Sequence, residues 1–239
     1  MANSHLQYLD SMGIQVWIRR QPIESPNLPT EIVQVNEVIQ PVSSLDWDAL
    51  QKQVIACTSC ELHKNRTKTV FGVGNPNADL MLIGEAPGAE EDIQGEPFVG
   101  RAGQLLNAML YAINLTRDDI YIANVVKCRP PENRNPNNNE MASCNNFLHQ
   151  QISLIKPKLI VAVGRISAQH LLDTNTPIGK LRNQQFNYNN IPLIATYHPA
   201  YLLRKPSEKR KSWQDLQFIN NNLTTILQKI QSYDNLSNH

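Results

Sequence analysis

Four short apolar runs limit the folds that this chain can adopt. They cover residues 80–83, 120–126, 159–163 and 192–197. Helical patterns separate the first three runs. Continuous apolar runs of this length are typical of strands buried on both faces, and strands that alternate with helices form mainly parallel sheets with helices on both faces. The sequence therefore predicts an α/β fold built around four strands.

The predicted helices lie between and after these runs. One core-facing helical stripe is formed by Leu105, Leu106, Met109, Leu110 and Ile113. Further helical patterns cover residues 45–54, 141–155, 166–172 and 207–230. Residues 186–194, with two asparagines at their centre, are typical of a hairpin, and residues 69–74 of a short strand or turn.

Composition excludes several classes of protein. The chain has 239 residues and a formal net charge of +1, so a polyanionic partner would have to bind a local basic patch. No apolar run approaches the roughly 20 residues of a membrane span, and no secretory signal is recognisable, so we expect a cytoplasmic protein. Residues 1–46 lack periodicity and are predicted to be a flexible N-terminal extension, with residues 233–239 as a C-terminal tail.

Four cysteines need an explanation, because disulfides are rare in the cytosol. Cys57 and Cys60 form a C-x₂-C motif, whereas Cys128 and Cys144 lie far downstream with fifteen residues between them. The motif does not lie between a strand and a helix as a redox motif would, and the second spacing is too wide for a zinc knuckle. An iron–sulfur cluster accepts scattered thiolates because its iron corners are separate. A zinc ion and four unrelated buried thiols remain the alternatives.

Two segments with polar residues follow the first two apolar runs. Glu85 comes directly after Gly84, where the carboxyl end of a strand faces the ligand crevice of an α/β sheet. The loop at residues 129–139 is rich in Pro and Asn. Together with Lys127, its cations Arg129 and Arg134 could bind phosphates. The alternative for the segment after Gly84 is an ordinary strand–loop–helix connection with a solvated acidic loop. The alternative for residues 129–139 is a solvated loop with scattered charges.

Several long motifs resemble the family-4 uracil-DNA glycosylases. They are GEAPGAEED, GEPFVGRAGQLL, NVVKCRPPENRNP and HPAYLLR, with four cysteines in the same order as in that family. The resemblance covers residues 53–230. It implies a three-layer α/β/α sandwich with a central, mainly parallel four-stranded sheet, in a glycosylase domain at residues 47–232. The implied activity is DNA repair: hydrolysis of the N-glycosidic bond of uracil in DNA, which releases free uracil and leaves an abasic site.

The resemblance also assigns residues. It implies a [4Fe–4S] cluster held by Cys57, Cys60, Cys128 and Cys144, and a uracil pocket formed by Glu85, Ala86, Glu91, Phe98, Asn124 and His198. One branch of the superfamily traps its substrate covalently through a histidine in an inserted basic loop. Residues 129–139 contain no histidine, so we expect ordinary turnover.

The implied chemistry suits these residue types. Breaking the N-glycosidic bond creates a cationic sugar and an anionic base, so Glu85 is expected to hold a water and stabilise the cation, and His198 to donate to the uracil 2-oxygen. The Asn124 amide can accept from the uracil ring N–H and donate to the 4-oxygen, whereas cytosine presents the opposite pattern. Phe98 is expected to stack on the extruded base and Glu91 to exclude the methyl group of thymine.

The remaining assignments concern DNA. The expected contacts are a phosphate clamp and a wedge that fills the gap left by the extruded base, formed by Arg129, Arg134, Tyr201, Leu202, Leu203 and Arg204. We expect a monomer that acts on single- or double-stranded DNA, associates with the nucleoid and binds no membrane, with a sliding clamp or another repair protein as a further partner. The competing hypothesis is an inactive nucleic-acid-binding or polymerase-accessory protein with the same fold and cluster.

Overall fold

A computed structural model describes residues 46–237, with side chains to residue 232. The predicted flexible extension at residues 1–46 lies outside the described residues except for Asp46. No helix in the described part of the chain is both long and apolar enough to cross a bilayer.

A six-stranded sheet forms the centre of the described unit, with the strand order β1-β3-β2-β4-β6-β5. The strands β3, β2, β4 and β6 are parallel to one another, and β1 and β5 pair antiparallel at the two edges. The bounds are β1 Val73–Gly74, β2 Leu80–Gly84, β3 Ile120–Asn124, β4 Leu159–Val163, β5 Gln185–Tyr188 and β6 Ile191–Thr196. The prediction of a mainly parallel sheet is confirmed. The four parallel strands β2, β3, β4 and β6 correspond to the four apolar runs.

The count of four strands was too low because the two edge strands carry no continuous apolar signal. β1 has two residues, and β5 alternates between exposed and half-buried residues. The predicted hairpin is confirmed as β5 and β6, which are joined by Asn189 and Asn190 at φ 47° and 67°. Asparagine tolerates this left-handed conformation better than most residues, and two-residue hairpin turns require it.

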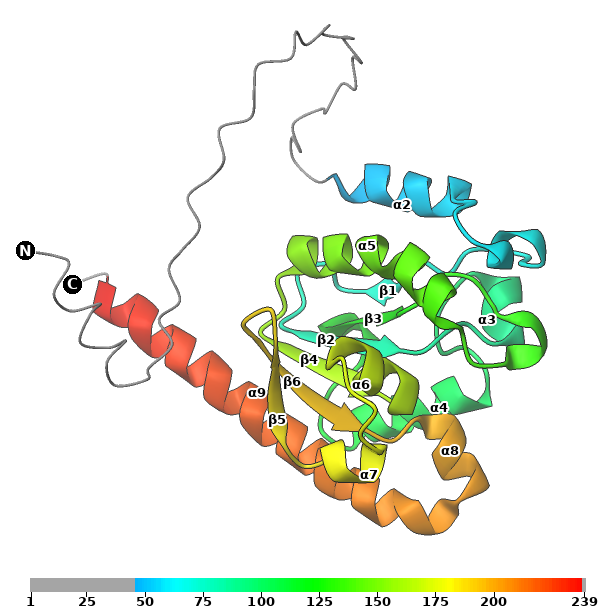
Figure 1. Ribbon diagram of the computed structural model, residues 1–239. Helices are drawn as coiled ribbons and strands as arrows, with labels where there is room; N and C mark the ends of the chain where they lie inside the picture. Colours follow the sequence, from blue (N-terminus) through cyan, green and yellow to red (C-terminus); the bar gives the residue numbers. More distant parts are fainter. Residues whose placement is uncertain (1–45, 238–239) are drawn as a thin grey trace, which may run out of the picture. The chain divides into compact units, whose positions relative to one another are not determined.

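Helices cover both faces of the sheet (Figure 1), as the three-layer fold requires. On one face, Leu148 and Ile152 of α5 and Ala168 of α6 pack on Met81 and Ile83 of β2. On the other, side chains of α4 and α9 pack on the alternate residues of the same strands. The bounds are α2 Trp47–Ala56, α3 Ala89–Gln94, α4 Arg101–Tyr111, α5 Asn138–Ile155, α6 Arg165–Leu171, α7 Ile178–Leu181, α8 Pro199–Arg204 and α9 Lys209–Ser237. Short 3₁₀ turns are η1 Glu61–Lys64, η2 Arg117–Asp119, η3 Pro131–Asn133 and η4 Pro206–Glu208.

Two helices differ from their predicted bounds by three residues or more at one end. α5 begins three residues before the predicted start at residue 141, because Asn137 and Glu140 form a reciprocal capping box. α9 continues to Ser237 instead of ending at residue 230. Residues 231–237 contain neither Pro nor Gly to end the helix.

The parallel register brings four strand ends to one edge of the sheet. Gly84 of β2 pairs beside Asn124 of β3, and Val163 of β4 beside Thr196 of β6. The chain leaves β2 for β3 on one side and returns to β4 on the other, so β2 marks the switch point of the sheet. Ligands of open α/β sheets bind at the carboxyl ends of strands at such a point.

Candidate active site

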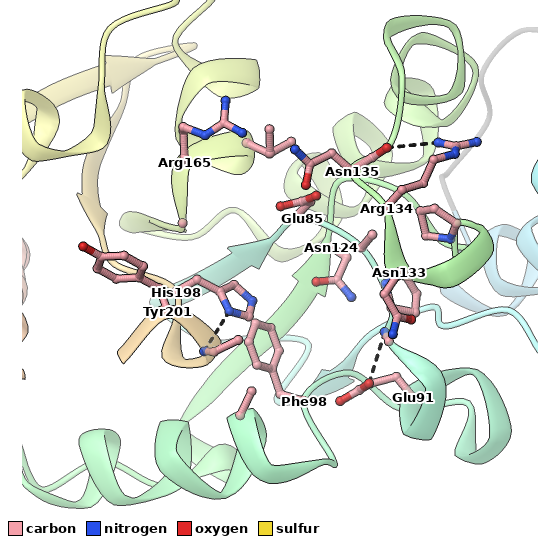
Figure 2. Close-up of a pocket in the computed structure, with 18 of the residues that line it drawn as sticks. Glu85, Glu91, Phe98, Asn124, Asn133, Arg134, Asn135, Arg165, His198 and Tyr201 are labelled. Atoms are coloured by element: carbon pink, nitrogen blue, oxygen red, sulfur yellow. Dashed lines mark hydrogen bonds between the residues drawn. The ribbon is translucent and has the colours of Figure 1, made fainter. Parts of the chain in front are cut away.

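A cavity of about 660 Å³ lies at these strand ends. Its lining includes all six residues of the predicted uracil pocket, namely Glu85, Ala86, Glu91, Phe98, Asn124 and His198, together with Arg134, Tyr201 and Arg204 of the predicted DNA contacts. Figure 2 shows labelled side chains around the cavity from the ends of β2 and β3, the loop before α5, the loop before α4, and the helices α3, α6 and α8. Arg129, Leu202 and Leu203 do not line the cavity.

Glu85 follows β2 and is half-buried in the cavity wall. Burial raises the pKa of its carboxyl group, and the positive charge of Arg165 opposes that rise. The Asn135 amide, oriented so that both of its neighbours are satisfied, donates to Glu85 Oε1 over 3.1 Å and accepts from Arg165 Nη2 over 3.2 Å. One carboxylate oxygen is therefore held by the protein, while the other is left for a ligand or a water.

Asn124 ends β3 and is 2% exposed. Its Oδ1 atom is buried and has no hydrogen-bond partner among the described residues. An unpaired buried carbonyl costs free energy of about 1–3 kcal/mol, so it indicates a partner that arrives with the ligand. Gly84 on the neighbouring strand makes room for this side chain, because a Cβ atom there would collide with Asn124 Oδ1 and lie 2.8 Å from Phe98 Cζ.

Phe98 is held in a left-handed backbone conformation, with φ at 54°. Such strain persists only where the surroundings enforce it, and it is concentrated at functional sites. Arg117 Nη1 donates to the carbonyl of Phe98 over 3.1 Å, and Nη2 to that of Pro97 over 2.7 Å. The backbone of Gly103 in α4 lies so close to Phe98 that no Cβ atom would fit between them.

Glu91 secures the same loop from α3. Its carboxylate accepts the backbone N–H groups of Gly88, Val99 and Gly100 over 3.0–3.2 Å. The side chain was predicted to exclude the thymine methyl group, and it does line the cavity. Its Oε1 atom nevertheless binds the segment after Phe98, and its Oε2 atom binds Gly88 at the start of α3. Its clearest contribution is therefore to fix the segment that carries Phe98.

His198 begins α8 and stacks against Phe98, with ring centroids 5.3 Å apart and planes inclined by 27°. Its Nδ1 atom accepts the backbone N–H of Ala200 over 3.1 Å. Burial and, to a smaller extent, the nearby Arg204 charge lower the pKa of the imidazole to about 4, while the Glu91 charge opposes them. The ring is therefore neutral at pH 7, with its proton on Nε2.

Two residues predicted to contact DNA, Leu202 and Lys127, are buried, so this prediction is wrong for them. Leu202 is 1% exposed and packs in the core with Tyr197 and Leu216, so it cannot act as the wedge, whereas Leu203 is 36% exposed. Lys127 is 1% exposed and cannot meet a phosphate. Arg129 donates to Asn133 Oδ1 over 2.7 Å, and Arg134 forms a bidentate ion pair with Glu140. The side chains of both arginines are therefore held by hydrogen bonds within the loop and to the start of α5.

The sequence reasoning missed Asn135, Arg165 and Arg117. Arg165 lies directly after Gly164 at the end of β4, and that strand-end position is a signal that could have identified it. Asn135 belongs to a loop whose fold gives no periodic signal. Arg117 lies nineteen residues beyond Phe98, in a short turn, and no pattern in the sequence connects the two.

All four cysteines line a second, small pocket between the end of α2, η1, the loop after β3 and α5. Burial raises the pKa of Cys128, and it raises that of Cys144 to about 11. Arg66 Nη1 donates to Cys128 Sγ over 3.1 Å, and the Lys127 backbone N–H to Cys144 Sγ over 3.3 Å. In residues 46–237, no three His, Cys, Asp or Glu side chains are close enough to hold a metal ion. Four thiols that line one pocket are a donor set that an iron–sulfur cluster accepts.

Comparison with known proteins identifies the family of this chain. The model of the uracil DNA glycosylase superfamily matches residues 71–217. The chain is 41% identical over 180 residues to the type-4 uracil-DNA glycosylase of Archaeoglobus fulgidus. The aligned region covers 72% of this chain and 90% of that protein. It is 44% identical over 164 residues to the type-4 enzyme of Thermotoga maritima, over 68% of this chain and 85% of the relative. This chain therefore belongs to the uracil DNA glycosylase superfamily and, within it, to the type-4 uracil-DNA glycosylases.

Proposed function

We propose that this protein is a DNA repair enzyme that hydrolyses the N-glycosidic bond of uracil in DNA, releasing free uracil and leaving an abasic site. The observation that carries the proposal is the unpaired Asn124 Oδ1 atom in the wall of the cavity. The ring N–H of uracil would supply the missing donor, while the Asn124 amide nitrogen would donate to the 4-oxygen. Cytosine places an acceptor where uracil has this N–H, so the same carbonyl would repel it.

The other cavity residues take complementary roles in this reaction. The uracil would be extruded from the helix and stack on Phe98. The neutral His198 would donate from Nε2 to the 2-oxygen as negative charge develops on the departing base. Glu85 would hold the attacking water on the oxygen that Asn135 leaves free, and its negative charge would stabilise the sugar cation. The presence of the acid, the amide and the imidazole in one cavity favours an enzyme over an inactive binding protein.

DNA would be held by the cationic rim of the cavity. Arg134, Tyr201 and Arg204 line it. Leu203 is exposed on α8 and replaces Leu202 as the candidate wedge, and Arg129 lies on the neighbouring loop. We infer that these residues contact phosphates and fill the gap left by the extruded base.

The Asn124→Ala substitution tests the proposed function. We expect the single-turnover rate of uracil release from an oligonucleotide to fall by about 100-fold, because a bound uracil would lose its hydrogen bonds to the amide. The rate is measured as alkali-labile strand breaks, with Asn139→Ala on the exposed start of α5 as the matched control. An unaltered rate in a folded Asn124→Ala protein would remove the main support for this role.

We further propose that Cys57, Cys60, Cys128 and Cys144 hold a [4Fe–4S] cluster. Such a cluster would fasten α2 and η1 to α5 and to the loop after β3, which is a structural role. No step of the proposed reaction passes through it.

Purified protein is expected to be brown and to contain about four iron atoms per chain. The Cys144→Ala variant should lose iron and melt at a lower temperature than the unaltered protein. A colourless protein with one zinc ion per chain would contradict the cluster. Iron content and visible absorption decide between the two.

A further inference from the structure

Lys127 is a buried cation for which the proposed reaction supplies no role. It is 1% exposed, and no other lysine or arginine in residues 46–232 is buried to this degree. No carboxylate of the described residues pairs with it. A buried ammonium is costly, so the hydrogen bonds that it makes must offset the loss of its hydration.

The ammonium group joins β3 to α5. Lys127 Nζ donates to the backbone carbonyl of Asn124 over 2.8 Å and to Gln151 Oε1 over 2.6 Å. Gln151 is itself 0% exposed, and its Nε2 atom donates to the carbonyl of Phe71 over 2.8 Å. The Lys127 backbone N–H also donates to Cys144 Sγ, two turns before Gln151 on α5. Lys127 is therefore fixed to α5 at both of its ends.

The hydrogen bond from Lys127 to the Asn124 carbonyl lies at the end of β3. Asn124 is the last residue of β3, and Val125 and Val126 still donate to the carbonyls of Gly84 and Glu85. The Asn124 carbonyl instead accepts a hydrogen bond from the ammonium group, which bridges the bend that follows β3. The Asn124 Oδ1 atom has no partner of its own among the described residues. The direction of this side chain consequently depends on its backbone and on the packing of Gly84 and Phe98 around it.

We propose that Lys127 is a positioning residue for uracil recognition: its ammonium group, anchored by Gln151, fixes the Asn124 peptide and so aims the Asn124 amide at the pyrimidine edge. The inference rests on the proposed role of Asn124. It also explains why a lysine beside the basic loop points into the core rather than toward DNA.

The test replaces Lys127 with methionine, which keeps the length of the side chain and removes the donors. Free uracil is used as the probe, as a competitive inhibitor of excision. We expect its inhibition constant to rise about tenfold and the single-turnover rate to fall by a similar factor. The affinity for product DNA with an abasic site should change less than about twofold, since the phosphate contacts are untouched. Lys158→Met, on the exposed segment before β4, is the matched control and should leave all three values unchanged.

A folded Lys127→Met protein with the inhibition constant and rate of the unaltered enzyme would overturn the inference. If this variant does not fold, Gln151→Met decides, because it keeps the ammonium and removes one of its two acceptors. The inhibition constant should then rise about threefold, and no change would again refute the role. Failure of the proposed function is distinguishable: the unaltered protein would then neither release uracil nor be inhibited by it.

Discussion

Replacing Glu85 with glutamine is expected to lower the single-turnover rate of uracil release by about 10²- to 10⁴-fold, the range of a lost general base. The substitution keeps the shape of the side chain and removes the negative charge that faces the sugar cation. The neutral amide is also expected to bind the attacking water more weakly than the carboxylate does. The affinity for uracil-containing DNA should change little, because the amide can still bind Asn135.

Glu90→Gln is the matched control for this charge. Glu90 lies on α3, is exposed and does not line the cavity. Its variant should excise uracil at the unaltered rate. Equal rates for Glu85→Gln and the unaltered protein would show that the carboxylate is not needed, and the roles assigned to the cavity would have to be redrawn.

Replacing His198 with leucine is expected to lower the rate by about 10²- to 10³-fold, the cost of removing one donor from a developing anion. His149→Leu on α5 is the control, since His149 contacts Tyr188 and neither residue lines the cavity. A small effect of His198→Leu, within about twofold, would argue against a donor at the 2-oxygen.

The pH dependence gives an independent check of the charge on His198. Burial lowers the pKa of this imidazole to about 4, so the ring stays neutral as the pH rises from 6 to 8. Glu85 must be ionised, and burial raises its pKa, so any loss of rate should occur on the acid side, above the usual range of a glutamate. The rate should therefore stay level or rise from pH 6 to 8. A rate that falls through pH 6.5 would indicate a required imidazolium instead.

The fold was predictable where burial imposes a pattern. The parallel strands are enclosed on both faces, so each had to be a continuous apolar run, and the alternation with helices fixed their direction. A strand with one open side needs no such run, so residues 69–74 were predicted only as a short strand or turn, and β5 only as part of a hairpin. The start of α5 was also missed, because the capping box of Asn137 and Glu140 decides it rather than apolar spacing.

The site was predictable at the strand ends and unpredictable beyond them. Asn124 ends β3 and Glu85 directly follows the neighbouring parallel strand β2, so the topology alone brings them together. Lys127 and Leu202 were misjudged because a lysine beside a basic loop and a leucine two residues before an arginine in HPAYLLR both suggested a surface that meets DNA. Only tertiary packing shows that each points inward.

The central claim is that one cavity presents the acid, the amide and the imidazole to a single extruded uracil. A crystal structure of the protein with free uracil tests it most directly. We predict the pyrimidine stacked on Phe98, with its ring nitrogen N3 about 2.9 Å from Asn124 Oδ1 and its 2-oxygen within hydrogen-bond distance of His198 Nε2. Uracil bound elsewhere, or bound here with Asn124 Oδ1 still unpaired, would contradict the account.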